Sequence, residues 1–161
     1  MSFRILPYDE TYRAEVLALS LRSWAPVFAQ LEPAVPPYVY HTFYPDGWGA
    51  RQTADIGRFL DAEGRCVWVA CDDRAVLGWV GVRLHPEDHM GEVYILAVDP
   101  DRQRQGLARA LLERALDHMR DAGMRIAMVE TGDDPGHAPS RAAYERSGFE
   151  RWPVARYFRE L

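Results

Sequence analysis

The sequence predicts one α/β (α+β) domain with a mixed, mostly antiparallel central sheet flanked by helices. Two observations carry this prediction. The chain has 161 residues, of which 48% are hydrophobic, which suits a single domain spanning residues 1–161 with a sizeable core. Apolar residues alternate with a period of two in the middle of the chain, whereas helical stripes precede and follow that stretch.

The first third of the chain is expected to contain one strand and two helices. Alternation predicts a strand over 3–8, and apolar spacing predicts helices over 12–22 and 52–60. Between the helices lies the lid segment, residues 24–48, which is rich in aromatic side chains and prolines. Prolines forbid a continuous helix and exposed aromatic surface is costly, so we expect this segment to fold over the domain as a partly irregular lid.

The middle of the chain predicts three strands. Residues 66–71 and 76–82 alternate on either side of a turn at 72–74 and form a hairpin. Residues 92–98 form the third strand, which Asp99-Pro100 ends.

The last third of the chain predicts two more helices and further strands. A clear apolar stripe begins at Leu107, and Gly123 ends that helix. A strand over 126–130 and a short helix over 138–146 follow, and 149–158 is expected to form a terminal strand or pair of strands.

The charge balance excludes several classes of protein. Nineteen basic and 24 acidic residues give a net charge of -5, which argues against nucleic acid as the partner because phosphate binding needs a basic face. All 19 basic residues are arginine. A Walker-type phosphate loop, a protein kinase and a pyridoxal enzyme each need a lysine at the reacting centre, so none of them fits.

Targeting and metal motifs are also missing from the sequence. No run of 18 apolar residues occurs, so neither a signal peptide nor a membrane span is expected and the default location is the cytoplasm. No C-x-x-C, H-E-x-x-H or G-x-S-x-G pattern occurs, so we expect no metal site and no serine hydrolase.

The junction between the third strand and the long helix has the features of an anion site. The first amides of a helix lack partners and favour negative charge, and Gly106 lets a ligand approach the backbone. Arg102 and Arg104 add positive charge nearby. The alternative is a tight turn in which Gly106 and Ala108 only permit close packing.

Three pieces of this region resemble the GNAT superfamily of acetyl-CoA-dependent N-acetyltransferases. The pattern Gln103-x-x-Gly106-x-Ala108 is similar to the superfamily signature [QR]-x-x-G-x-[GA], and residues 95–100 are similar to its lead-in. Residues 137–149 resemble N-x-x-A-x-x-x-Y-E-x-x-G-F at the same spacing. The resemblance implies that residues 91–149 form the acetyl-CoA-binding and catalytic core.

The resemblance assigns expected roles to single positions. Tyr144 corresponds to the tyrosine that protonates the departing thiolate, and the exposed backbone of the strand would pair with the pantetheine arm. His137 stands where asparagine is usual and Ser140 where alanine is usual, so contacts there depart from the pattern. The implied cofactor-binding residues are Leu96, Ala97, Val98, Gln103, Arg104, Gln105, Gly106, Leu107, Ala108, His137 and Ser140.

Amine acetylation needs a base, because an alkyl ammonium has a pKa of about 10 and only the neutral amine attacks a thioester. Glu92, at the start of the strand that would hold the cofactor, is the first candidate, and Glu130, at the end of the next strand, is the rival. The alternative for each residue is that it is a solvated carboxylate at a strand end with no catalytic role.

The acceptor is expected to be a small molecule with a primary amine, and an aminoglycoside-type antibiotic is our first hypothesis. Trp24, Tyr38 and Tyr40 could stack on sugar rings, while Asp133 and Asp134 could meet ammonium groups. The alternatives are a ribosomal-protein type of N-terminal acetyltransferase and a CoA-binding regulatory module. The sequence is equally compatible with a monomer and with a homodimer.

Overall fold

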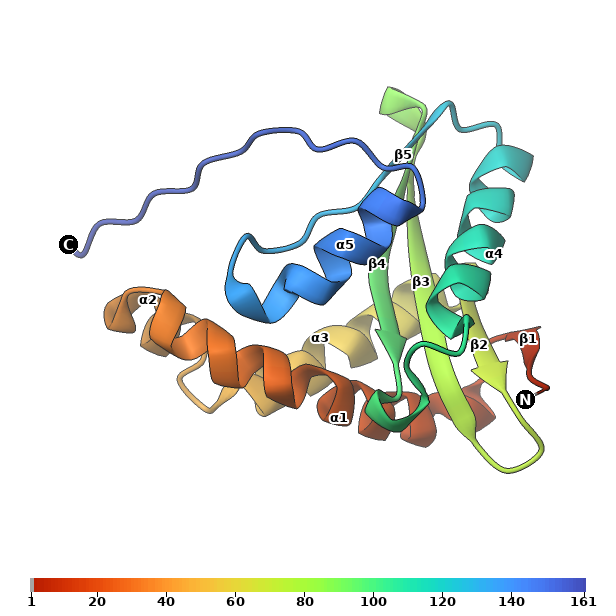
Figure 1. Cartoon of the computed structure of the whole chain (residues 1–161), viewed down its shortest axis with the longest axis horizontal. Coiled ribbons are helices and arrows are strands. Elements are labelled where there is room, and N and C mark those ends of the chain that lie inside the picture. Colours follow the sequence, from red (N-terminus) through yellow and green to blue (C-terminus); the bar gives the residue numbers. More distant parts are fainter. Residues whose placement is uncertain (1) are drawn as a thin grey trace.

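Five strands form one sheet in the computed structural model, which describes residues 2–161 (Figure 1). Neighbouring strands are antiparallel except β4 and β5, which run parallel. This confirms the predicted mixed, mostly antiparallel sheet. In chain order the strands are β1 (Arg4–Pro7), β2 (Val67–Cys71), β3 (Val76–His85), β4 (Met90–Val98) and β5 (Ile126–Met128).

Helices cover both faces of the sheet, as Figure 1 shows. On one face, α1 (Arg13–Leu31) and α3 (Trp48–Glu63) enclose a core around Trp79. On the other face, α4 (Leu107–Asp121) buries its apolar stripe against β2, β3 and β4. The stripe consists of Leu107, Leu111, Leu112, Ala115 and Met119, each of which is nearly inaccessible.

One buried polar group inside the first core is fully paired. The hydroxyl of Ser20 on α1 donates to the carbonyl oxygen of Val16 (2.6 Å) and accepts a hydrogen bond from the indole N–H of Trp79 (2.9 Å). A buried hydroxyl without partners would cost free energy, so this pair also fixes how α1 lies across β3.

The lid segment is mostly helical, which corrects the expected break at its prolines. Helix α1 continues through Pro26 to Leu31, and α2 (Pro37–Phe43) follows a short turn. Proline has no backbone N–H, so a helix that continues through it loses one hydrogen bond. Phe28, two residues beyond Pro26, is buried among the lid aromatics, and that packing supports the helix past the proline.

The predicted terminal strand is also wrong. After α5 (Ala138–Arg146) the chain runs extended, and residues 149–158 form no strand with any other part of residues 2–161. We call residues 150–161 the arm. Figure 1 shows it leaving the body and passing toward the far end of α2. Its apolar side chains are open to solvent, with Trp152 83% and Tyr157 90% exposed.

The other predicted elements are present with shifted ends. Helix α3 extends the predicted 52–60 in both directions, and β5 is shorter than the predicted 126–130. The predicted helix over 138–146 is confirmed without change. Among the residues described, no helix is both long and apolar enough to cross a membrane.

Candidate functional site

Strands β4 and β5 separate after three residue pairs, and this opens the sheet. Their parallel pairing runs from Met90 opposite Ile126 to Glu92 opposite Met128 and then stops. The register between β3 and β4 shifts between Gly81 and Val82, opposite residues 93–95. Within residues 2–161, the outer edge of β4 from 93 to 98 therefore has no strand beside it, so its backbone groups can meet a ligand.

The two catalytic candidates lie on opposite faces of the sheet at this opening. Glu92 is directly opposite Arg83, whose guanidinium covers the ring of Tyr94 on the face of α1 and α3 (4.1 Å). Residues directly opposite in a strand pair share a face, so Glu92 faces the same way. Tyr144 packs with the core under α4. A ligand in the gap between β4 and β5 would thus have a carboxylate on one side and a phenol on the other.

The junction of β4 and α4 leaves the helix amides open. Gly106 is the N-cap at φ +83, no side chain caps the helix, and its first turn has no acidic residue. A Cβ on Gly106 would meet nothing within 4 Å, so the backbone there is accessible. Arg104 has a φ of 61°, which is in the left-handed region and is uncommon for a residue with a side chain, so the loop turns sharply there. Open amides and a nearby guanidinium together suit an anionic group such as pyrophosphate.

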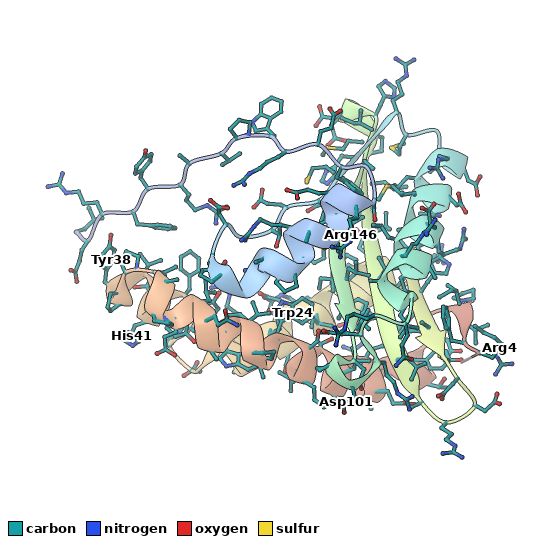
Figure 2. All side chains as sticks on the ribbon, in the orientation of Figure 1. Arg4, Trp24, Tyr38, His41, Asp101 and Arg146 are labelled. Atoms are coloured by element: carbon teal, nitrogen blue, oxygen red, sulfur yellow. The ribbon has the colours of Figure 1, made fainter. Side chains whose placement is uncertain are left out.

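The loop before α4 is anchored to α1 by an ion pair. The Asp99 carboxylate lies 2.7 Å from the Arg22 guanidinium and also accepts the amide of Asp101 (3.0 Å). Burial opposes the charge on Asp99, but these hydrogen bonds outweigh it and lower the pKa of the carboxyl. Figure 2 shows Asp101 in this loop, where β4 ends.

His85 is a site residue that the sequence analysis missed. Its Nε2 lies 2.7 Å from a carboxylate oxygen of Glu92, and both side chains are mostly shielded from solvent. His85 is opposite Met90 in the β3–β4 hairpin, so Glu92 is its diagonal neighbour on the same face. The signal was available, because a short turn at 86–88 fixes this register once both strands are assigned.

The rival base is held differently. Glu130 is 73% exposed, and its carboxylate lies 3.2 Å from the guanidinium of Arg156 on the arm. Asp133 lies 2.7 Å from Arg151, also on the arm. Both acidic groups therefore face arginines in this structure, and neither is buried.

The loop that carries these acids is tied down from inside. Asp134 contacts the ring of His137 (Nδ1–Oδ1 2.6 Å), and Arg141 donates to the carbonyl oxygens of Gly132 (2.6 Å) and Asp134 (2.8 Å). At Gly136 the loop meets α1 so closely that a Cβ would lie 2.7 Å from the carbonyl oxygen of Val27. The side chains of Asp134 and His137 are thus engaged with each other rather than directed to solvent.

Tyr144 is protonated at every ordinary pH. Burial raises the pKa of its phenol to about 12. Ser140, a predicted cofactor contact, lies one turn before Tyr144 on α5. The Tyr144 ring packs edge-on against Phe149 (5.9 Å). Burial is the one cause of the pKa shift, and no hydrogen bond of the hydroxyl contributes to it, so the phenol keeps a proton that it can donate.

The aromatic side chains of the lid segment mostly pack on one another. Phe28 stacks on Trp48 (4.6 Å), and Tyr40 packs on Tyr44 (4.9 Å) and is 8% exposed. Trp24 is half-buried where α1 passes under α5, whereas Tyr38 lies at the far end of α2 (Figure 2). Of the three predicted acceptor contacts, Trp24 is the one beside the sheet.

No metal centre is found in the part of the chain that the structure describes, because no three histidine, cysteine, aspartate or glutamate side chains come together in a suitable way. Cys66 and Cys71 are both free thiols.

The chain is similar in sequence to known acetyltransferases. The model of the acetyltransferase (GNAT) family matches residues 30–149. A mycothiol acetyltransferase of Actinosynnema mirum is 38% identical over 94 residues, which are 58% of this chain. The match covers 30% of that enzyme, so the chain spans less than a third of the length of this relative.

Two solved structures share the fold at low sequence identity. The ribosomal-protein-S18-alanine N-acetyltransferase of Escherichia coli has a TM-score of 0.67 and 19% identity, covering 94% of this chain and 80% of its own. The aminoglycoside N-acetyltransferase AAC(6')-Iy in complex with CoA has a TM-score of 0.67 and 16% identity, covering 99% and 95%. Equal scores for enzymes named after such different acceptors mean that the fold leaves the acceptor open.

Proposed function

Because the chain belongs to the acetyltransferase (GNAT) family, we propose that it transfers the acetyl group of acetyl-CoA directly to a primary amine of a small molecule. The observation that carries this proposal is the opening between β4 and β5 beside the uncapped start of α4. It offers an unpaired strand edge for an amide-rich chain and free helix amides for a pyrophosphate.

The residues at the opening fit acetyl-CoA. The amides of residues 103–108 and the guanidinium of Arg104 would hold the pyrophosphate, and the edge of β4 at 96–98 would bind the pantetheine arm. When bound, acetyl-CoA supplies the activated acetyl group as a thioester. Among the described residues, no side chain caps or blocks the start of α4, so the accessible backbone at Gly106 supports this fit.

Glu92 is the base that this geometry favours. The acceptor ammonium must lose a proton before its nitrogen can attack, and a carboxylate that is mostly shielded from solvent at the opening can receive it. His85, at 2.7 Å, holds that carboxylate in place and can pass the proton toward solvent. Glu130 is the weaker candidate because it is exposed and already faces Arg156.

Tyr144 is suited to donate a hydrogen bond to the departing thiolate rather than to complete the proton transfer. Its pKa of about 12 lies more than three units above that of an ordinary thiol, so full transfer is uphill by roughly 5 kcal/mol. Solvent can deliver the proton after the thiolate has left.

A small-molecule acceptor is supported by the names of two compared proteins, mycothiol acetyltransferase and aminoglycoside N-acetyltransferase. We propose an amino sugar or aminoglycoside, whose ring could lie on Trp24 and whose amine would approach Glu92. The net charge of -5 favours such a cationic molecule over an acidic one.

Thiol release from acetyl-CoA, measured with a panel of amines, tests this function. The panel contains aminoglycosides, simple amino sugars, polyamines and peptides with a free N-terminus. We expect release in proportion to the added amine, with a kcat/KM at least about tenfold larger for an amino sugar or aminoglycoside than for any peptide. A preference for peptides would identify the N-terminal type of enzyme, and CoA binding without release would identify a regulatory module.

A further inference from the structure

Two opposite charges lie directly across the β3–β4 pair, yet no ion pair joins them within residues 2–161. Arg83 on β3 is opposite Glu92 on β4, and side chains in such a position are normally close enough to attract each other. The Glu92 carboxylate instead contacts His85 (2.7 Å), and the Arg83 guanidinium lies over the ring of Tyr94 (4.1 Å). The two side chains therefore diverge, and each charge has a different neighbour.

The guanidinium of Arg83 is held by two aromatic rings. Phe59 on α3 stacks on Tyr94 with the ring centroids 4.6 Å apart, and the guanidinium lies 5.5 Å from the Phe59 centroid. Phe59 is buried, so it fixes the ring over which the guanidinium lies. The face of an aromatic ring attracts a cation but offers no oxygen, so the five N–H donors of the guanidinium gain no carbonyl or carboxylate partner from it.

These donors also find no oxygen elsewhere in the described part of the chain. Between residues 2 and 161, Arg83 makes no hydrogen bond and no ion pair, and its side chain is partly shielded from water. Arginines near the opening differ in this respect, because Arg141 donates to two carbonyl oxygens and Arg151 and Arg156 each face an acid. A partly shielded guanidinium without an anion can bind one that a ligand brings.

The guanidinium of Arg83 lies beside the proposed acceptor position. The pairing of β4 with β5 ends at Glu92, and Tyr94 is the second residue beyond that end. The register shift between β3 and β4 leaves Tyr94 without a direct partner on β3. Because the guanidinium lies over this ring, its positive charge is at the opening, next to the residue that would take the acceptor's proton.

We propose that Arg83 binds a carboxylate of the acceptor, so that the acceptor is a small amine that also carries a carboxylate, such as an acidic amino sugar. This inference rests on the proposed function, because Glu92 would receive the proton of the same molecule's ammonium group. A guanidinium and a carboxylate form two parallel N–H···O hydrogen bonds, and Arg83 lies directly opposite Glu92, so one small molecule can reach both. Arg83 thus determines specificity and takes no part in the proton transfer.

The charges at the opening favour a carboxylate over a phosphate or a second amine. A carboxylate carries one negative charge, which Arg83 alone can neutralise, whereas a phosphate carries nearly two and would lie close to Glu92. The two acids after β5 that could bind further ammonium groups already face arginines of the arm. The net charge of -5 attracts a cation from a distance, but the groups in contact with the acceptor decide which amine is held.

Matched pairs of acceptors test this assignment. One pair is glucosaminuronic acid and glucosamine, and the other is alanine and alaninamide; the pairs hold the amine and the carboxylate at different separations. Thiol release from acetyl-CoA gives kcat and KM for each. We expect the acidic member of at least one pair to have a kcat/KM about 10- to 100-fold higher than its neutral counterpart, the worth of hydrogen bonds between charged groups, with the difference mainly in KM.

Variants of Arg83 show whether this residue causes the preference. Arg83→Gln removes the charge and should reduce the preference to within about twofold, and Arg83→Lys keeps the charge without the planar fork and should restore part of it. Arg114→Gln is the matched control and should keep the full preference, because Arg114 also lies over an aromatic ring, that of Trp68 (4.7 Å), but on the face of the sheet under α4. Both members of a pair are measured on one preparation, so a change in stability cancels from their ratio.

Calorimetry with CoA in place of acetyl-CoA measures the affinity for the acceptor without turnover. The acidic amine should bind at least about tenfold more tightly than its neutral counterpart, and Arg83→Gln should remove that difference. No preference for the acidic member of either pair, or a preference that Arg83→Gln leaves intact, would overturn the proposal. Failure of the proposed function is distinct, since no amine would then release thiol, while the difference in affinity would still support Arg83 as the carboxylate site.

Discussion

The two strands that flank the opening are held in different ways. The far end of β4 leads through the Asp99–Arg22 pair into α4, whose apolar stripe is buried against the sheet. The far end of β5 leads into a loop and an arm that are joined to each other by exposed ion pairs. We call the first the donor side, because it would hold acetyl-CoA, and the second the acceptor side.

This difference indicates which part of the function is built into the core. The geometry of the donor side follows from burial of α4, so its amides keep their places with or without ligand. Exposed ion pairs are worth at most about 1 kcal/mol each, so the acceptor side can rearrange at little cost. Glu92 lies on β4 and is therefore part of the donor side, but its proposed role is to take a proton from the acceptor amine.

Replacing the base should have the largest effect. Glu92→Gln keeps the shape of the side chain but removes proton acceptance, and general-base catalysis is typically worth about 10²–10⁴-fold in rate. With an acceptor amine of pKa about 10, the variant's rate should climb toward that of the original enzyme as pH rises, because a larger fraction of the amine is then already neutral in solution and needs no base. Steady-state kinetics across pH measure both effects.

Glu87→Gln is the control for this experiment. Glu87 is exposed and lies 3.7 Å from the other nitrogen of His85, so its loss alters the charge near the pair without removing the base. It should leave the rate within about twofold. A pH-independent loss in Glu92→Gln that is confined to the amine KM would mean that the carboxylate binds the ammonium and that Glu130 is the next candidate base.

The donor side is tested by Gly106→Glu, which places a Cβ and a carboxylate where pyrophosphate would bind. Affinity for acetyl-CoA, measured by calorimetry, should fall by at least about tenfold, or 1.4 kcal/mol. Gly123→Glu is a matched control at the other end of α4, since its φ of +78 imposes the same backbone strain. Equal affinities in the two folded variants would remove the anion site from the donor side.

The sequence predicts the donor side better than the acceptor side for a physical reason. Residues 92–108 are specified by local patterns: an alternating strand, an Asp-Pro stop and a helical stripe. The continuation of α1 through Pro26 and the contact of His85 with Glu92 depend on packing between separate elements. The arm has the aromatic and apolar residues that are typical of strands but pairs with no strand among residues 2–161, and no local pattern could reveal that.

The acceptor side is tested at Trp24. If this ring stacks on the acceptor, Trp24→Ala should raise the amine KM by roughly 2- to 30-fold, the worth of a contact of 0.5–2 kcal/mol, and leave the KM for acetyl-CoA unchanged. Tyr38→Ala, at the far end of α2, should change the amine KM less. A parallel rise in both constants for Trp24→Ala, or a large loss of stability, would make Trp24 a core residue and end the stacking hypothesis.

The smallest effect is expected at Tyr144, which stands between the two sides. Tyr144→Phe keeps the ring against Phe149 and removes only the hydroxyl, so kcat should fall by about two- to tenfold, the worth of one hydrogen bond. Because the pKa of Tyr144 is about 12, the phenol is protonated throughout the pH range of 6–10, and the ratio of the two rates should not change across it. A loss of 10²-fold or more would show that solvent cannot replace the phenol as the acid. A ratio that narrows well below pH 12 would mean that bound substrate brings the tyrosine's ionisation into the working range.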